Sequence, residues 1–326
     1  MPAKTEPGPA KAQPSPVVAV MSSDDALRAL VRTCLAHLVA NQRGMLEGSD
    51  PEYLHQTRVA LRRLRSVFAT FKGLLPEGAL APLIEETRWL ARMLGPARDW
   101  DVFNDETLPP LTARHSGHAG VAAMTGSAAR LRIGANRRAR RAVASARAQR
   151  LLRALEEWLS ADAPMAGSTV ALAPVPPSDG ARLETPDAEL AGPVTGFARA
   201  VLDAASKRVA KRGRDLGGLA PRELHRLRIA AKKLRYAVEF FAPLYDEARA
   251  GAYRAALVRL QDALGAYNDA VTVKQLAVRA KRGVQGAAAD EAFDIMLSWS
   301  AGMRETGTRN LQRVWKKFRA ARAFWE

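Results

Sequence analysis

Apolar residues recur at spacings of three and four along most of this chain, which is the period of an amphipathic helix. The first such face includes Leu27, Leu30, Val31 and Leu38, and Ser22 offers it an N-cap. Further helices are expected over residues 53–73, 80–94, about 99–108 and about 128–159. No segment alternates apolar and polar residues as a strand does, so the pattern predicts an all-α protein.

Two stretches lack the helical period. Residues 1–21 are rich in proline, and we expect them to form a disordered tail. Residues 161–190 combine proline with small residues, as a linker does. Helical periodicity resumes near Val194, so the predicted domains are a first helical bundle over 22–160 and a second over 191–326.

The two predicted bundles share a repeated sequence. LHQTRVALRRLRSVFATF at 54–71 aligns with LHRLRIAAKKLRYAVEFF at 224–241 without insertion, so that His55 corresponds to His225. The same register places Asp99 on Asp269 and the Leu-Gly pair at 94–95 on the pair at 264–265. Self-similarity over this distance predicts two related bundles in tandem.

Each copy of the repeat carries a row of cations on one helix face. At about 100° per residue, the members of each row fall within about 80°, opposite a leucine and phenylalanine face. The first basic row is His55, Arg58, Arg62 and Arg65, flanked by Arg63, and the second is His225, Arg228, Lys232 and Arg235, flanked by Lys233. No acid lies between positions 55 and 71, so the first row is not an ordinary face of i,i+4 ion pairs, although acids from neighbouring helices, such as Asp99 or Glu85, remain as possible partners.

Composition points to an anionic partner. The formal net charge is +17, which favours nucleic acid, an anionic membrane or a phosphate polymer. An arginine-rich composition could produce the bulk charge, but it does not explain where the charges lie. Neither a signal peptide nor about 18 consecutive apolar residues is found, so we expect a soluble cytoplasmic protein.

The sequence offers little for catalysis or metal binding. Cys34 is the single cysteine, which excludes an intramolecular disulfide and a CxxC site. Neither a phosphate-binding glycine loop nor a nucleophile elbow is found. His55 and His225 lack carboxylate or histidine partners at ligand spacing, and Asp99 and Asp269 are expected to cap or salt-bridge the following helix. We therefore expect no catalytic residue, no metal and no cofactor.

HQTRVALRRLRS with LGPARDWDVF, followed by LHRLRIAAKKLRYAVEFF with LQDALGAYNDAV, resembles the two halves of a CHAD domain. The resemblance covers roughly residues 22–326. It implies a tandem pair of four-helix-type bundles with pseudo-twofold internal symmetry, whose basic helices line a central surface that binds inorganic polyphosphate without catalysis. Some members of the family are targeted to polyphosphate granules.

The resemblance also implies which residues contact the ligand, by motif alone. These are His55, Arg58, Arg62, Arg63 and Arg65 in the first half, and His225, Arg228, Lys232, Lys233 and Arg235 in the second. A second set rests only on charge and helical placement: Asn41, Lys207, Lys211, Arg137 and Arg141. Each histidine either grips phosphate or holds its helix in place, and the sequence leaves both roles open.

Two other functions fit parts of the pattern. A nucleic-acid-binding protein would use the same electrostatics, but it would normally offer aromatic platforms, and within the two rows Tyr236 is the one candidate. A metal-dependent phosphohydrolase acting on phosphate polymers would need a cluster of carboxylates near the histidines, which the sequence does not show.

Overall fold

The computed structural model describes residues 8–161 and 191–326, except for the side chains at 267, 268, 306 and 308. Its first half contains α1 (Ser23–Glu47), α2 (Pro51–Phe71), α3 (Ala81–Val102), α4 (Leu108–Arg114), α5 (Ala119–Ala144) and α6 (Ala146–Ser160). The second half contains α8 (Val194–Arg212), α9 (Pro221–Phe241), α10 (Glu247–Lys281) and α11 (Ala287–Ala320). The described residues form no strand, which confirms the predicted all-α class.

Local signals explain where the two basic helices begin. Asp50 caps α2, its side chain accepting from the Glu52 N–H, and Pro51 occupies the first helical position. Pro221 opens α9 in the same way, where Glu223 accepts from the Ala220 N–H. Both helices therefore start at a proline and end at a phenylalanine that occupy equivalent positions of the repeat.

Two of the predicted helix boundaries are wrong. The segments expected at 80–94 and 99–108 belong to one helix, because α3 runs through Pro96 to Val102 and continues as a π-helix over Phe103–Thr107. The long helix expected at 128–159 begins instead at Ala119 and breaks at Ser145, whose backbone is extended and whose side chain caps α6. Serine competes with the helix for its own backbone groups, which favours such a break.

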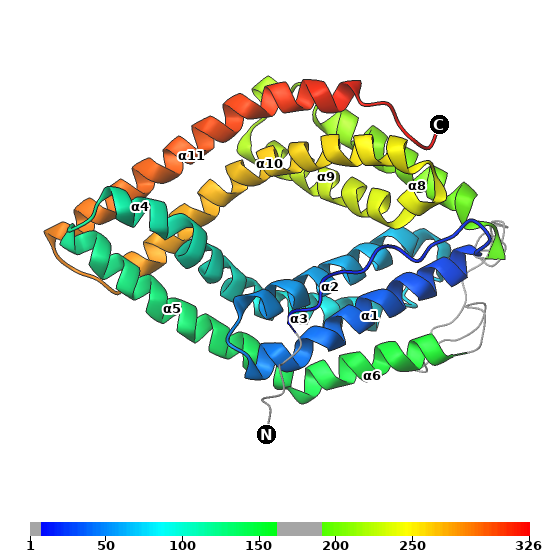
Figure 1. Ribbon diagram of the computed structural model, residues 1–326, viewed down its shortest axis with the longest axis horizontal. Helices are drawn as coiled ribbons and strands as arrows, with labels where there is room; N and C mark the ends of the chain where they lie inside the picture. Colours follow the sequence, from blue (N-terminus) through cyan, green and yellow to red (C-terminus); the bar gives the residue numbers. More distant parts are fainter. Residues whose placement is uncertain (1–7, 162–190) are drawn as a thin grey trace, which may run out of the picture.

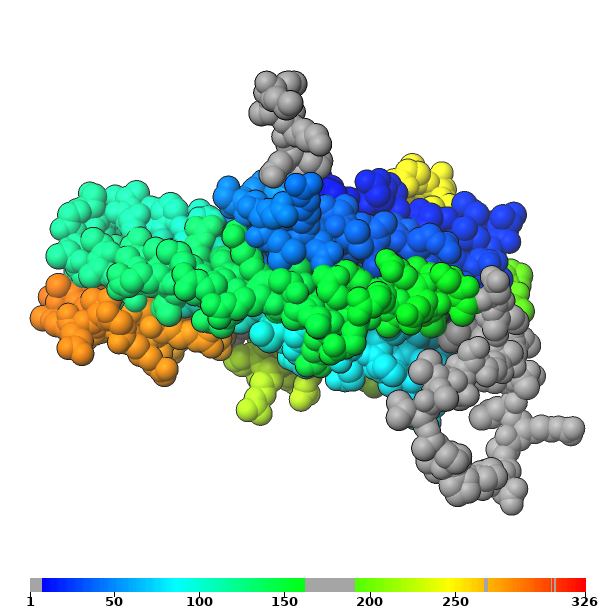
Figure 2. All heavy atoms as spheres, turned by 90° about the horizontal axis from the view of Figure 1, so that it is seen from below, coloured from blue at the N-terminus to red at the C-terminus, as the bar shows by residue number. Residues whose placement is uncertain are grey.

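The two halves meet at both ends of the long axis (Figure 1). At one end, the ring of Phe197 in α8 lies 4.9 Å from that of Phe71 in α2 and 6.0 Å from that of Phe241 in α9. At the other end, Ser127 of α5 donates to the Ala280 carbonyl of α10 at 2.8 Å. The outer side of the first half is formed by α5 and α6, the green helices of Figure 2.

The repeat is less regular in the structure than in the sequence. The second half uses the unbroken 35-residue α10 and 34-residue α11, where the first half has α3, the π-helix, α4, α5 and α6. The equivalence of α2 and α9 is close, whereas pseudo-twofold symmetry of the whole stays a prediction from the resemblance.

The segment before α1 is packed from its first contacts at Ala10. Ala10 exchanges two hydrogen bonds with the Asn41 side chain, at 3.1 and 2.9 Å. Ser15 Oγ donates to the Phe240 carbonyl at 2.6 Å, and Val17 has no exposed surface. The expectation of a disordered tail over 1–21 is therefore wrong for this segment, because its polar groups find partners on both halves.

The remaining boundary predictions fall partly outside the described residues. Residues 1–7 of the expected tail and 162–190 of the expected linker are among those that the structure does not describe. Among the described helices, none is long and apolar enough to cross a membrane.

The junction between α5 and α11 offers a test of this architecture. A Cβ at Gly120 would overlap the Ala288 carbonyl, which is backbone and cannot swing away. We expect Gly120→Ala to lower the free energy of unfolding by about 1–3 kcal/mol, as overpacking does. Urea denaturation followed by circular dichroism measures this change.

Gly134→Ala, on the same helix, is the matched control. Its Cβ would meet only the end of the Arg138 side chain, so the better helix propensity of alanine should raise stability by about 0.5–1 kcal/mol. Equal stability of the two variants would contradict the close approach of α5 to α11.

Candidate functional site

The two basic rows come together where α2 approaches α9. The Arg62 guanidinium of α2 lies over the ring of Tyr236 in α9, 5.8 Å from its centroid. Desolvation, together with the nearby cations Arg228 and Arg62, lowers the pKa of Lys232 to about 8. A cation of the first half therefore lies close enough to cations of the second half to perturb their charge.

The first row lies against α3. Arg58 is half-buried, and its Nη1 donates to the Ala91 carbonyl at 3.4 Å. A Cβ at Gly95 would stand 3.4 Å from the same nitrogen, so the Arg58 side chain reaches the backbone of α3 at this glycine. Burial lowers the pKa of Arg58, and Asp99 opposes that effect.

Other members of the first row differ in exposure. Arg62 and Arg65 are exposed, whereas His55 is half-buried. Burial lowers the pKa of His55, and Arg98 of α3 lowers it further. The neutral form of this imidazole is thus favoured as long as no anion is bound nearby.

The second row is built in the same way on α9. Arg228 and Lys232 are half-buried, whereas His225, Lys233 and Arg235 are exposed. Arg235 Nη1 donates to Gln261 Oε1 of α10 at 3.1 Å, and this bond ties the row to its neighbour.

A cavity of about 360 Å³ lies at the start of α9. His225 and Arg228 line it together with Arg222 and Arg226, over a floor that includes Leu224. The sequence prediction missed Arg222 and Arg226 because it selected cations that occur in both copies of the repeat. The first copy has Glu52 and Gln56 at the equivalent positions. The second half of the site is therefore the more basic.

Arg63 does not belong to this exposed surface. Its side chain is 3% exposed, and its Nη1 donates to the Gln13 carbonyl at 2.9 Å and forms an ion pair with Glu239 Oε1 at 3.3 Å. Arg63 was expected to contact the ligand, and its burial corrects that assignment. The side of α2 that carries Arg63 faces α9 and the N-terminal segment. Of the second set, Asn41 is buried as well, whereas the others, Lys207, Lys211, Arg137 and Arg141, are exposed.

Two carboxylates accompany the rows. Asp99 and Asp269 lie within α3 and α10, so of the two roles expected for them, helix capping and salt bridging, capping is wrong. Desolvation raises the pKa of Asp269; Arg228 and Lys232 lower it, and Asp99 of the other half raises it. The two carboxylates therefore share one neighbourhood, in which they offset only part of the positive charge.

Two further cations join this neighbourhood from outside the repeated helices. Desolvation raises the pKa of Asp99, and Arg58, Arg279 and Arg98 oppose it. Arg98 stands next to Asp99 in the motif and was within reach of sequence reasoning. Arg279 lies near the end of α10, and its approach to α3 follows only from how the halves pack.

The described residues contain no group of three or more histidine, cysteine, aspartate or glutamate side chains that could hold an ion.

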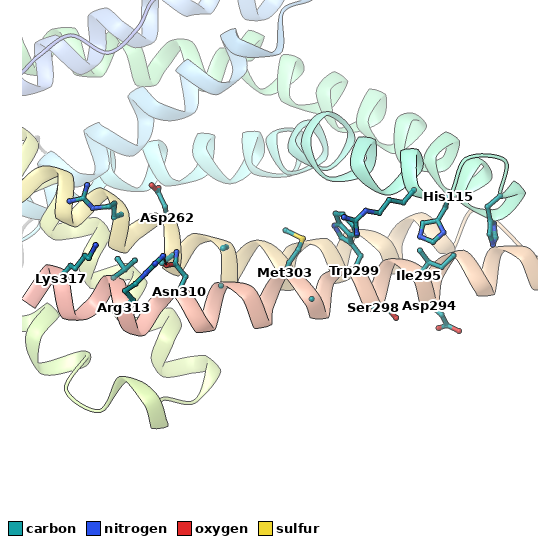
Figure 3. Close-up of a pocket in the computed structure, with 18 of the residues that line it drawn as sticks. His115, Asp262, Asp294, Ile295, Ser298, Trp299, Met303, Asn310, Arg313 and Lys317 are labelled. Atoms are coloured by element: carbon teal, nitrogen blue, oxygen red, sulfur yellow. Dashed lines mark hydrogen bonds between the residues drawn. The ribbon is translucent and has the colours of Figure 1, made fainter.

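A larger cavity, of about 1430 Å³, lies elsewhere (Figure 3). It follows α10 and α11, with an apolar floor that includes Trp299 and Met303 and charged side chains such as Asp262, Arg313 and Lys317. Its described lining includes none of the residues predicted from the sequence. The basic rows thus form an open surface rather than the wall of this cavity.

The family model of the CHAD domain matches residues 29–278. The crystal structure of the CHAD domain from the plant Ricinus communis is similar, with a TM-score of 0.79 and 28% sequence identity, covering 97% of this chain and 98% of that one.

PptA from Streptomyces chartreusis shares the fold, with a TM-score of 0.66 and 19% identity over 91% of this chain and 100% of that one. No curated protein matches the sequence significantly. Because the family model covers well over half of the residues, the chain belongs to the CHAD domain family.

Proposed function

We propose that the surface formed by the two basic rows binds inorganic polyphosphate. The observation that carries this proposal is the closeness of Arg62 on α2 to Arg228 and Lys232 on α9, which lets a single polyphosphate molecule contact both rows. Membership of the CHAD family supports it. Binding of this kind would retain the protein at polyphosphate granules.

Many weak contacts suit a polymeric anion. One cation about 4 Å from a phosphate gains about 1 kcal/mol in bulk water and about 4 kcal/mol at an effective dielectric constant near 20. Contacts along two rows add by avidity and by the release of counterions from the polymer. Arginine contributes a planar fork that matches two phosphate oxygens, and both rows contain it.

Nucleic acid is supported less well as the ligand. Tyr236, the aromatic candidate within the rows, is 7% exposed and lies beneath Arg62. A ring in this position offers no free face on which a base could stack.

The proposed role is to hold polyphosphate rather than to cleave it. We expect no phosphate release from long-chain polyphosphate with magnesium or manganese, because the described residues place no cluster of metal ligands beside the rows. A malachite green assay measures the release. Metal-dependent release that His55→Ala abolishes would contradict this part of the proposal.

Charge reversal within the rows tests the binding site. We expect Arg62→Glu and Lys232→Glu each to weaken binding of long-chain polyphosphate by about tenfold or more, equivalent to about 1.4 kcal/mol, since each replaces an attraction by a repulsion. Affinity should also rise with chain length and fall with salt. Isothermal titration at fixed ionic strength measures each affinity.

Arg153→Glu is the matched control, because Arg153 is exposed on α6 and the charge change is the same. The proposal fails if this control loses as much affinity as the row variants. Equal binding of orthophosphate, tripolyphosphate and the long chain would also refute it, and displacement of the long chain by an equal phosphate concentration of DNA would favour nucleic acid.

The pKa of Lys232 predicts a pH dependence of binding. In the protein without a ligand, the pKa of Lys232 is about 8, and a bound anion raises this pKa because it favours the charged form. The contribution of Lys232 to the binding affinity is therefore fully present below pH 8 and declines as the pH rises through and above that value. Titrations between pH 7 and 10 measure the decline.

Lys232→Arg separates this effect from general weakening. Arginine stays charged over the whole range, so the variant should bind with little change between pH 7 and 9. An identical decline in the variant and the wild type would show that another group is responsible.

A further inference from the structure

The N-terminal segment touches both halves at the place where α2 and α9 approach each other. We define residues 10–17 as the N-terminal clamp. It is held to α1 by Asn41 through Ala10, and to α9 by Ser15 through the Phe240 carbonyl. Figure 1 shows this segment as the dark blue trace beside α1 and α2. The clamp therefore spans the boundary between the halves.

Arg63 links the clamp to both basic helices. It lies on α2, donates to the Gln13 carbonyl of the clamp at 2.9 Å, and reaches Glu239 of α9 at 3.3 Å. Its Nε is buried without a partner among the described residues. One buried guanidinium thus connects three parts of the chain within a turn of Arg62, whose own side chain lies on the exposed surface.

This connection provides a second point of attachment between α2 and α9. The first is the aromatic contact of Phe71, Phe197 and Phe241 at the helix ends. Arg63 precedes Phe71 by eight residues, which is about 12 Å along the axis of α2. The two attachments join points about 12 Å apart on α2 to neighbouring positions on α9, so together they restrict how α2 lies against α9 more than the aromatic contact alone does.

The chemistry of Arg63 indicates a geometric role rather than a stabilising one. Removing the Arg63 charge from water is expensive, and the attraction to Glu239, which is 30% exposed, offsets only part of that cost, so the pair contributes little net stability compared with apolar residues of the same size. Its strict geometry can specify one arrangement among several. Here that arrangement is the separation of the two basic rows.

We propose that Arg63 and the N-terminal clamp position the two basic rows, and that this spacing gives the surface its preference for long phosphate chains over short ones. The inference rests on the proposed function. A short chain can occupy one row whatever the distance to the other. A long chain gains from both rows only when their separation is fixed at a distance that the chain can span.

Two full-length variants test the proposal without removing a cation from either row. Arg63→Met/Glu239→Gln breaks the link while leaving no unpaired buried charge, and Ala10→Pro/Ser15→Ala weakens the clamp at both of its ends. Val18→Ala, at a position 48% exposed just beyond the clamp, is the matched control. Affinities for tripolyphosphate and for long-chain polyphosphate are measured by titration, and folding by circular dichroism.

We expect both variants to lose about tenfold in affinity for the long chain, while the affinity for tripolyphosphate stays within about twofold, because only avidity is lost. The control should bind like the wild type. Unchanged affinity for the long chain overturns the proposal. So does an equal loss for both ligands, since Arg63 would then act as an ordinary ligand or through the fold. If the Arg63 variant does not fold, the Ala10 and Ser15 variant decides.

A distance measurement separates this proposal from the proposed function. Nitroxide labels at Ala69→Cys on α2 and Ile229→Cys on α9, in a Cys34→Ala background, report the spacing of the helices by pulsed electron paramagnetic resonance. If the wild type shows no preference for long chains, the proposed function fails, and these distances alone then test whether Arg63 and the clamp fix the separation of α2 and α9. A broader distribution in both variants supports it, and an unchanged distribution overturns it.

Discussion

Repulsion between like charges is the constraint around which this protein is built. Burial lowers the pKa of Lys232 to about 8 together with the nearby cations Arg228 and Arg62, so holding these charges together opposes folding. Apolar packing has to outweigh that repulsion, and the buried rings of Phe71 and Phe241 stand at the ends of both helices. An anion bound between the rows would relieve the same repulsion. The free protein therefore holds electrostatic strain that a bound anion would reduce.

Neighbouring residues on α2 face different surroundings. Arg62 points to the exposed surface and Arg63 into the junction, because successive residues of a helix are turned by about 100°. On α9, Lys232 lies at the basic surface and Glu239, seven residues later, lies at the junction. On α2 alone, neighbouring residues thus face the surface and the junction, and a change at the junction lies one residue from the basic row.

The sequence was sufficient for those features that depend on a single helix. The period of apolar residues predicted the all-α class, and the internal repeat predicted that α9 would resemble α2. A helical projection gives the angle of each side chain about its own axis, so it placed the two basic rows on one face each. It also placed Arg63 to one side of the first row, without indicating what occupies that sector.

The features that could not be predicted depend on distant parts of the chain. Arg63 is buried because residues 50 positions earlier and a glutamate on α9 cover it. Arg279 reaches the site through the packing of α10, and residues 8–21 look like a tail because their partners lie elsewhere in the sequence. The continuity of α3 through Pro96 is likewise a property of the folded chain, since proline alone argues against it.

The contact between Ser15 and Phe240 joins residues 225 positions apart, so it can form only after Phe240 has been synthesised. At translation rates of about 5–20 residues per second, α9 leaves the ribosome roughly 10–45 s after the N-terminal segment. During that interval the first half has neither Glu239 nor the Phe240 carbonyl to bind. Closure of the junction is therefore a late event in the life of the nascent chain, because the N-terminal clamp is made before α1 but reaches its partners on α9 only after α9 has been made.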